Sequence, residues 1–287
     1  MNIIFNTRWI ALSAVAFAAL FALLSSQTLI ASEFRQTAIK LVHFDVDPAN
    51  ATRIEVASAN GDIIITGNDT DKVVVAAEIH VNGRKSEVCE ELAGRVSIEA
   101  VRNGTLLEID PDLPRKFGYN ISISYTILIP SRLGVSLETA NGELAVYNSK
   151  GNVSADATNG SILLESVSGD VEASSVNGSI FLSKLIAKKI VAETINGRID
   201  CECISNAPHS IEISTVNGSI EVTLPRGANA SLSAGTVNGG LSIDTGQGQI
   251  TSKSRGNIDM SIGDGSGSYK FSSVNGSIGV VVSTPAD

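Results

Sequence analysis

The chain has 287 residues and a formal net charge of −9 at pH 7. This acidic balance excludes recognition of nucleic acid or of an anionic membrane surface by charge. Aromatic residues make up only 5% of the chain and glycines number 26, which suits thin, repetitive β-structure better than a thick globular core.

Residues 1–32 are predicted to lie outside the fold. Arg8 precedes an uncharged apolar run from Trp9 to Leu24, and a stretch of small and polar residues then leads to Glu33. This order is typical of a secretory signal peptide. The alternative is an uncleaved N-terminal anchor, because residues 9–31 are long enough to cross a bilayer. In either case we expect the rest of the chain to be exported, to the periplasm, the cell surface or the medium, with membrane contact only through this segment.

Residues 33–130 are expected to form a β-rich N-terminal region. Apolar and polar side chains alternate over residues 53–67 around Asn60-Gly61, a pattern typical of a β-hairpin. The same alternation at residues 72–81 predicts another strand.

A single short helix is predicted near residues 84–95. Ser86 is expected to cap its start. The apolar residues that recur there at helical spacing are Val88, Cys89, Leu92 and Val96.

The N-terminal region ends with two further strand signals. Residues 96–110 alternate around Asn103-Gly104, which predicts a second hairpin, and residues 119–130 predict a long strand that ends at Pro130. Residues 110–118 between them are expected to form a loop.

Residues 131–287 are expected to form a solenoid, because an Asn-Gly motif recurs there at a nearly fixed period. Successive Asn residues are 18, 18, 19, 21 and 21 positions apart. The last spacing is 37, and residues 256–258 (Gly-Asn-Ile) near its midpoint predict a further coil. An earlier copy of the motif stands at 60. The predicted corner turns are Asn60, Gly61, Asn141, Gly142, Asn159, Gly160, Asn177, Gly178, Asn196, Gly197, Asn217, Gly218, Asn238, Gly239, Asn275 and Gly276.

One coil cannot bury its apolar side alone, but stacked coils can, because each adds one strand to parallel sheets that run along the stack. Gly is expected to supply the positive φ of the corner, and the Asn amides are expected to bond from coil to coil. In the coil at 168–184, the expected inward residues are Val171, Ala173, Ile180 and Leu182, and the expected outward residues are Asp170, Glu172, Ser179 and Ser183. The predicted fold class is therefore all-β, a parallel β-solenoid with a mixed β N-terminal region that contains one short helix.

The three cysteines, Cys89, Cys201 and Cys203, do not form a recognisable metal or disulfide pattern. Cys201 and Cys203 share one face of a predicted strand, so a disulfide between them would be strained. With His209 nearby they could begin a metal site, but no second Cys pair follows. Buried small side chains are the favoured role, and no metal or cofactor is predicted.

Two other ligand signals are weak. Asn-Gly-Ser matches the N-glycosylation acceptor, but a polar residue after a turn creates that match automatically. The segment IGDGSGS at 262–268 resembles a calcium-binding repeat but occurs only once. The chain has ten such acceptor sites, which include Asn50, Asn120, Asn159, Asn177 and Asn275.

No catalytic residue is predicted. Parallel β-helices can support polysaccharide cleavage, but catalysis needs convergent acids and bases on loops above the scaffold. The coils carry almost no insertions, and only the loop at 110–118 could build a cleft. The outward acids are expected to form a solvated face: Glu143, Asp156, Glu165, Asp170 and Glu172.

The chain resembles a family of bacterial "putative adhesin" domains that is related to auto-transporter adhesin heads. The resemblance rests on RIEVASANGDIIITG at 53–67, the helix, the strand that ends at Pro130, and LETANGELAV at 137–146. It continues through residues 223–244 and 273–281, so it covers nearly all of residues 34–281. The resemblance implies a β-solenoid in an exported or envelope location, and it supplies no catalytic residues.

We therefore expect an exported, non-catalytic envelope protein, an adhesin or a binding scaffold that presents the faces of its solenoid to a polysaccharide or a protein. The alternative is a periplasmic sensory or assembly partner of a membrane complex, held by an uncleaved N-terminal segment. A polysaccharide-active enzyme is the least favoured class. The last coil, SSVNGSIGVVV at 272–282, is expected to end the solenoid with an open edge that could drive self-association.

Overall fold

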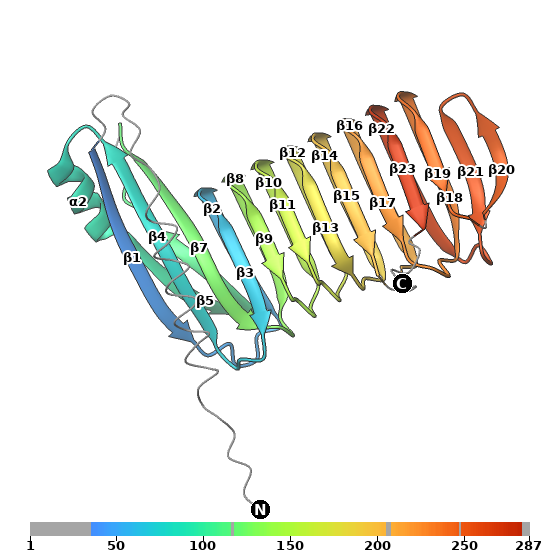
Figure 1. Ribbon diagram of the computed structural model, residues 1–287. Helices are drawn as coiled ribbons and strands as arrows, with labels where there is room; N and C mark the ends of the chain where they lie inside the picture. The colour runs from blue at the N-terminus through green and yellow to red at the C-terminus, as the bar shows by residue number, and fades with distance from the viewer. Residues whose placement is uncertain (1–35, 116–117, 205–207, 247, 283–287) are drawn as a thin grey trace, which may run out of the picture. The chain divides into compact units, whose positions relative to one another are not determined.

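The computed structural model describes residues 36–115, 118–204, 208–246 and 248–282 (Figure 1). The predicted signal peptide or anchor at 1–32 lies outside these residues. From Gln36 onward, the described chain forms an 11-stranded sheet, a 12-stranded sheet and one short helix. No helix within the described ranges is long and apolar enough to cross a membrane.

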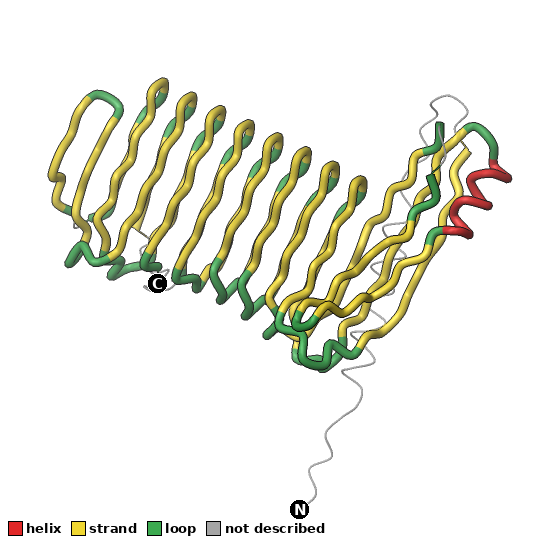
Figure 2. The backbone as a smooth tube through the Cα atoms, turned by 180° about the vertical axis from the view of Figure 1, so that it is seen from behind, coloured by secondary structure: helices red, strands yellow, loops and turns green. Residues whose placement is uncertain are grey.

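Most of the chain is a stack of coils, and each coil gives one strand to each sheet (Figure 2). In stack order, the coil strands of the 12-stranded sheet are β2 (Arg53–Asn60), β8 (Gly134–Asn141), β10 (Val153–Asn159), β12 (Val171–Asn177), β14 (Lys189–Asn196), β16 (Ser210–Asn217), β22 (Gly267–Asn275) and β18 (Ala230–Asn238). Their successors in the 11-stranded sheet are β3 (Ile63–Asn68), β9 (Leu144–Tyr147), β11 (Ile162–Glu165), β13 (Ile180–Leu185), β15 (Ile199–Cys203), β17 (Ile220–Leu224), β23 (Ile278–Val282) and β19 (Leu241–Asp244). All these coil strands pair in parallel, which confirms the predicted β-solenoid.

The core lies between the two sheets and is formed by alternate residues of each strand. Val171, Ala173, Ile180 and Leu182 are all buried, as the alternation predicts. Equivalent residues lie over one another along the stack, so Val171 pairs in register with Val153 on one side and with Ile190 on the other. Each such side chain contributes about 1.5–3 kcal/mol of burial free energy, which a single coil could not obtain alone.

The N-terminal region extends both sheets with strands that pair antiparallel to one another and join the coil strands in parallel. β1 (Gln36–Val46), β4 (Val73–Gly83) and β7 (Asn120–Pro130) continue the 11-stranded sheet. β5 (Ser97–Asn103) and β6 (Leu106–Asp112) form the second predicted hairpin and continue the 12-stranded sheet through β2.

The predicted helix is α2 (Ser86–Arg95), which packs against β1 and β4 with Cys89, Leu92 and Ala93 buried. The predicted cap is wrong. The N-cap position is Lys85, which makes no side-chain capping bond, whereas Ser86 lies within the first turn. Its Oγ donates to Oε1 of Glu90 at 3.2 Å instead.

The hairpin predicted at Asn60-Gly61 is also wrong. β2 pairs with β6 and β8 in one sheet, whereas β3 pairs with β7 and β9 in the other. The two strands lie in different sheets because both must bury apolar side chains in the core between the sheets. Ile54 of β2 and Ile63 of β3 point into this core and have no exposed surface. Asn60-Gly61 is therefore the corner of the first coil.

Two expectations for the C-terminal end are wrong. The segment around residues 256–258 forms no coil, because β20 (Gln249–Ser254) and β21 (Asn257–Ile262) are an antiparallel hairpin that turns at Arg255-Gly256. β21 occupies the outer edge of β18, so no coil can stack there in parallel.

The open edge predicted for residues 272–282 does not exist either. β22 lies between β16 and β18, and β23 lies between β17 and β19 (Figure 1). Both strands therefore have paired edges on both sides. The last strands of the sheets at this end are β19 and β20.

Candidate functional site

The predicted corner asparagines form a continuous ladder along one edge of the stack. In each step, Nδ2 of one Asn donates to Oδ1 of the Asn on the preceding coil, at 2.8–3.0 Å. In stack order the residues are Asn60, Asn141, Asn159, Asn177, Asn196, Asn217, Asn275 and Asn238. Each interior amide keeps one N–H and one lone pair for other partners, except Asn141, whose Nδ2 also donates to Ala59 O at 3.4 Å.

The glycines that follow are needed mainly because neighbouring corners touch through their backbones. A Cβ on Gly178 would lie 1.9 Å from the carbonyl oxygen of Gly160, and one on Gly160 would lie 1.7 Å from that of Gly142. Among the corner glycines, positive φ occurs only at Gly61 (+132°) and Gly142 (+151°), so the positive-φ reason predicted for every corner is wrong for the rest.

A second ladder, not anticipated from the sequence, lies inside the corner. The residue two positions before each Asn is a Ser or Thr in every coil except one, where it is Ala157. Thr194 Oγ1 donates to Gly178 O at 2.9 Å, and the same bond recurs at Thr139, Ser175, Thr215, Thr236 and Ser273. These hydroxyls satisfy the glycine carbonyls that the corner would otherwise bury.

The residue directly before each Asn points outward and creates an apolar row, which we call the corner ridge. It consists of Val176, Ile195, Val216, Val274 and Val237 in five successive coils, with exposed fractions of 39, 46, 40, 41 and 74%. The recurring Val-Asn-Gly and Ile-Asn-Gly were its signal in the sequence.

The acids considered for catalysis do not converge. Asp156 lies on β10 and Glu172 on β12, both in the 12-stranded sheet, and Asp170 directly precedes β12. All three are exposed. Glu165 lies in the other sheet and forms an ion pair with Lys184 (Oε1–Nζ 2.6 Å). Glu143 follows a corner glycine, and its backbone N–H donates to Asp62.

Cys201 and Cys203 lie side by side in the core with their Sγ atoms 3.9 Å apart. A hydrogen bond shared with Cys203, together with burial, raises the pKa of the Cys201 thiol well above its ordinary value. Both side chains are buried, as the favoured role of small core residues predicts. His209 is exposed outside the core, and no group of three potential ligands forms among the described residues.

The calcium and glycosylation signals fall on side chains with other structural partners. Asp264 accepts the N–H of Ser266 at 3.0 Å as part of a tight turn. Asn159, Asn177 and Asn275 belong to the amide ladder, so a glycan on their Nδ2 would compete with it. Asn50 and Asn120 are exposed.

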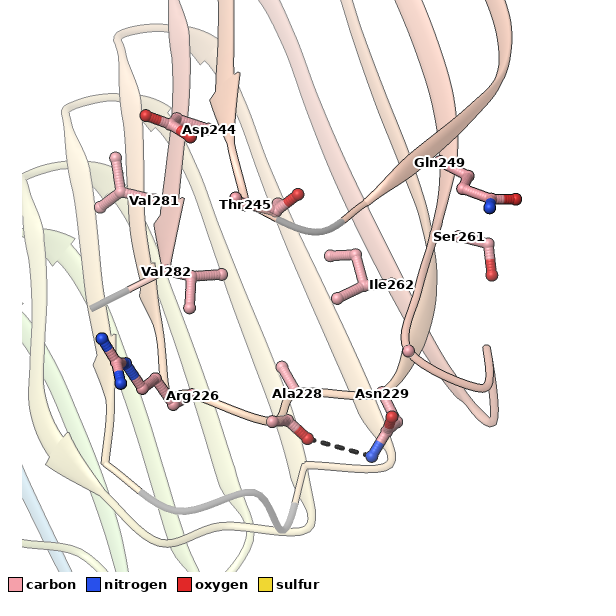
Figure 3. A pocket seen from close by; sticks show the side chains of 13 residues that line it. Arg226, Ala228, Asn229, Asp244, Thr245, Gln249, Ser261, Ile262, Val281 and Val282 are labelled. Atoms are coloured by element: carbon pink, nitrogen blue, oxygen red, sulfur yellow. Dashed lines mark hydrogen bonds between the residues drawn. The ribbon is translucent and has the colours of Figure 1, made fainter. Parts of the chain in front are cut away.

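A cavity of about 710 Å³ opens at the end of the stack, where β17, β19, β21 and β23 finish (Figure 3). Ile262 and Val282 form part of its apolar wall. Asn229 is fixed by Nδ2 donating to Gly227 O at 3.0 Å and by Oδ1 accepting from Asp264 N at 3.2 Å. The remaining labelled polar residues are Arg226, Asp244, Thr245, Gln249 and Ser261. This lining can hold a small polar molecule but brings no pair of carboxylates together.

A second hollow, of about 860 Å³, lies at the segment predicted as a loop at 110–118, whose first three residues are instead the end of β6. Its lining includes one carboxylate, Asp112, and one guanidinium, Arg115, beside Leu92, Tyr119 and Ile121. The hollow lies at the one segment that the sequence indicated could build a cleft. Its described lining offers no second acid for paired-carboxylate chemistry.

Comparison with known proteins gives a family but no characterised relative. No curated protein matches the chain. A "putative cell adhesion protein" from Clostridium sporogenes ATCC 15579 is 14% identical, with a TM-score of 0.38, over 86% of this chain and 100% of that one. A "putative adhesin" from Bacteroides fragilis NCTC 9343 is 16% identical (TM-score 0.39), over 85% of this chain and 97% of that one. A third, from Parabacteroides distasonis ATCC 8503, is 15% identical (TM-score 0.38), with the same coverage. The model of the Toastrack DUF4097 family matches residues 43–281, and the chain belongs to that family.

Proposed function

We propose that the chain is an exported, non-catalytic binding scaffold of the cell envelope, of the adhesin type, whose corner ridge contacts an extended, uncharged polysaccharide. The expected export rests on the N-terminal segment at 1–32, which has the pattern of a signal peptide or anchor. The binding role rests on the ridge.

The observation that carries the proposal is the regularity of this ridge. Neighbouring coils are about 4.8 Å apart, so five exposed β-branched side chains form a row about 19 Å long. The amide ladder runs beside it, with one N–H and one lone pair left on each interior Asn of these coils. Apolar surface next to amide groups at a fixed repeat suits a polymer whose rings have apolar faces and hydroxyl rims.

Charge supports an uncharged ligand. The chain carries a net charge of −9, so an anionic polymer would be repelled at long range. The ridge itself contains only valine and isoleucine, and the residues after its glycines include Ser179, Arg198 and Ser219. A neutral polysaccharide can therefore lie along this edge without electrostatic repulsion.

A non-catalytic role is supported by the setting of the outward acids, which lie on exposed sheet faces outside both cavities even where two are register neighbours, as Asp156 and Glu138 are. Asp156 and Glu172 belong to the outer face of one sheet, whereas Glu165 belongs to the other and is paired with Lys184. The two cavities lie at the stack end and at residues 110–118, and the described lining of each contains a single carboxylate.

The test compares two triple variants for sedimentation with envelopes isolated from the native host. Ile195→Ser, Val216→Ser and Val274→Ser together remove the centre of the ridge, and we expect binding to weaken by about tenfold or more. The control replaces three exposed apolar residues elsewhere, Ile186, Ile204 and Val281, with Ser. Equal binding by both variants would contradict the proposal.

Location is tested separately, by adding protease to intact cells and then to lysed cells. Digestion on intact cells is the expected result for an adhesin. Protection until lysis would contradict surface display and favour the alternative, a periplasmic partner of a membrane complex.

A further inference from the structure

The coil formed by β22 and β23 is the last to be made but not the last in the stack. β22 pairs in parallel with β16 on one edge and with β18 on the other. β23 pairs in the same way with β17 and β19. The chain therefore completes one coil, leaves a space, builds the next coil and the β20–β21 hairpin, and then returns to fill the space (Figure 1).

We call this space the strand slot, bounded by β16 and β17 on one side and by β18 and β19 on the other. Without its filling coil, β16, β17 and β18 would each have one unpaired edge, and β19 would lose its only sheet partner. It would also open the core, because the filling coil supplies four buried apolar side chains: Tyr269, Phe271, Ile278 and Val280. Unpaired backbone groups and uncovered apolar surface are both costly, so an empty slot binds a matching coil strongly.

The contacts that hold the coil in the slot are made by the coil itself. Ser273 Oγ donates to Gly218 O at 3.0 Å, and Asn275 Nδ2 donates to Asn217 Oδ1 at 2.8 Å. Tyr269 Oη donates to Pro208 O at 3.2 Å. None of these contacts depends on whether the coil comes from the same chain.

The covalent tie between the coil and the rest of the fold is a hinge of four residues, 263–266. Gly263 and Gly265 adopt positive φ angles of +60° and +74°. The hinge crosses under the start of β18, where Asp264 N donates to Asn229 Oδ1 and Gly267 N donates to Asn229 O. Among the described residues, those that follow the hinge all belong to the coil.

We propose that the strand slot is an acceptor site for β22–β23 of a second copy of this chain, so that copies are joined by exchange of their C-terminal coils. Exchange keeps every slot contact and changes only the hinge, which is the condition for domain swapping. Synthesis from the N-terminus makes the strands of both walls before residues 267–282, and the β18–β19 wall pairs with the rest of the stack only through this coil. Strand donation into an incomplete sheet is an established mode of recognition.

The test places one cysteine on a wall of the slot and one on the coil that fills it. Glu212 and Lys270 are directly opposite in the β16–β22 register, and both are exposed. Neighbouring strands are about 4.8 Å apart, within the Cα range of a disulfide, about 4.4–6.8 Å. Full-length Glu212→Cys and Lys270→Cys chains, refolded together and then oxidised, should give a covalent heterodimer.

The matched control uses Ser154→Cys and Glu172→Cys, which are opposite in the β10–β12 register within the interior of the stack. Those coils are held by chain on both sides and cannot exchange, so that mixture should give no heterodimer. The native cysteines in the described chain are buried and should not react. A Glu212→Cys and Lys270→Cys mixture that stays monomeric would overturn the proposal.

The hinge provides a second, independent test. Deleting residues 264–266 leaves two Cα steps, about 7 Å, between Ile262 and Gly267. β21 and β22 flank β18 and are therefore about 9.6 Å apart, so the coil could not return to its own slot. We expect dimers or longer oligomers by light scattering, and a folded monomer would contradict exchange.

Discussion

At the scale of single residues, the corner is specified by three consecutive requirements that the motif Ser/Thr-x-Asn-Gly meets. The hydroxyl donates to a glycine carbonyl on the neighbouring coil, as Thr194 does to Gly178. The Asn continues the amide ladder, and the Gly leaves room for the next backbone. The residue between hydroxyl and Asn is unconstrained by these contacts, which leaves it available for the exposed ridge.

Ala157 is the one position of the hydroxyl row without a hydroxyl, so it tests this account directly. Ala157→Ser should give Gly142 O the donor that its neighbours have, and we expect about 0.5–1.5 kcal/mol of added stability. The reverse change, Ser175→Ala, removes the 3.0 Å bond to Gly160 O and should cost a similar amount. Urea unfolding measures both, and destabilisation by Ala157→Ser would contradict the role of the row.

At the scale of elements, the β20–β21 hairpin protects the end of the 12-stranded sheet, whereas β19 ends the 11-stranded sheet. Every residue of β20 is exposed, and a bulge interrupts its pairing between Ile250 and Ser252. Lys253 is opposite the buried Ile258, so a charge lies on the inner face of the edge strand. Bulges and inward charges are devices that prevent edge-to-edge pairing. Association by coil exchange needs no open edge and is compatible with this protection.

The inserted strand β22 should make the free energy of unfolding depend on pH in the alkaline range. Burial of the Tyr269 phenol, and to a smaller extent the nearby Cys203, raises its pKa to about 12 from an ordinary value of 10.0. In the unfolded chain the phenol ionises first, so the free energy of unfolding should fall as pH rises from about 10 to about 12. The expected loss is on the order of 1–2 kcal/mol, measured by urea unfolding across that range.

The control for this prediction is Tyr269→Phe, which removes the ionising group and should flatten the pH dependence. Burial, with a smaller contribution from Asp110, also raises the pKa of Tyr125, so the double Phe variant should flatten it further. A slope unchanged by both substitutions would show that other groups control alkaline unfolding.

At the scale of the whole molecule, the repeat predicted the architecture because its information is local. The Asn-Gly period places two strands and two corners per coil, and parallel stacking follows from the need to bury one face. For the same reason, the sequence did not predict the order in which the coils stack. VNGSI is identical at 176, 216 and 274, so nothing in the motif tells which coil neighbours which. Asn60-Gly61 was misread for a related reason, since a corner between sheets and a hairpin within one sheet use the same turn residues.

The functional surface was less accessible to sequence reasoning than the fold. The hydroxyl row and the ridge were both present as repeated residue types before Asn, but assigning them to the inside and the outside of a corner required the register. The end cavity could not be predicted, because it depends on the loop at 225–229, the hairpin and the inserted coil meeting in space.

Because coils interact only with their neighbours and share one register, a whole coil should be removable. Deleting residues 160–177 joins Asn159 to Gly178, restores the Asn-Gly corner and lets β10 take the place of β12 beside β14. We expect a folded protein with unchanged strand content per residue by circular dichroism and a smaller urea m-value, since less surface is buried. Deleting only residues 160–168 would join β10 to β12, which lie in the same sheet, and should abolish cooperative unfolding. Equal behaviour of the two deletions would mean that coil register is not what organises the stack.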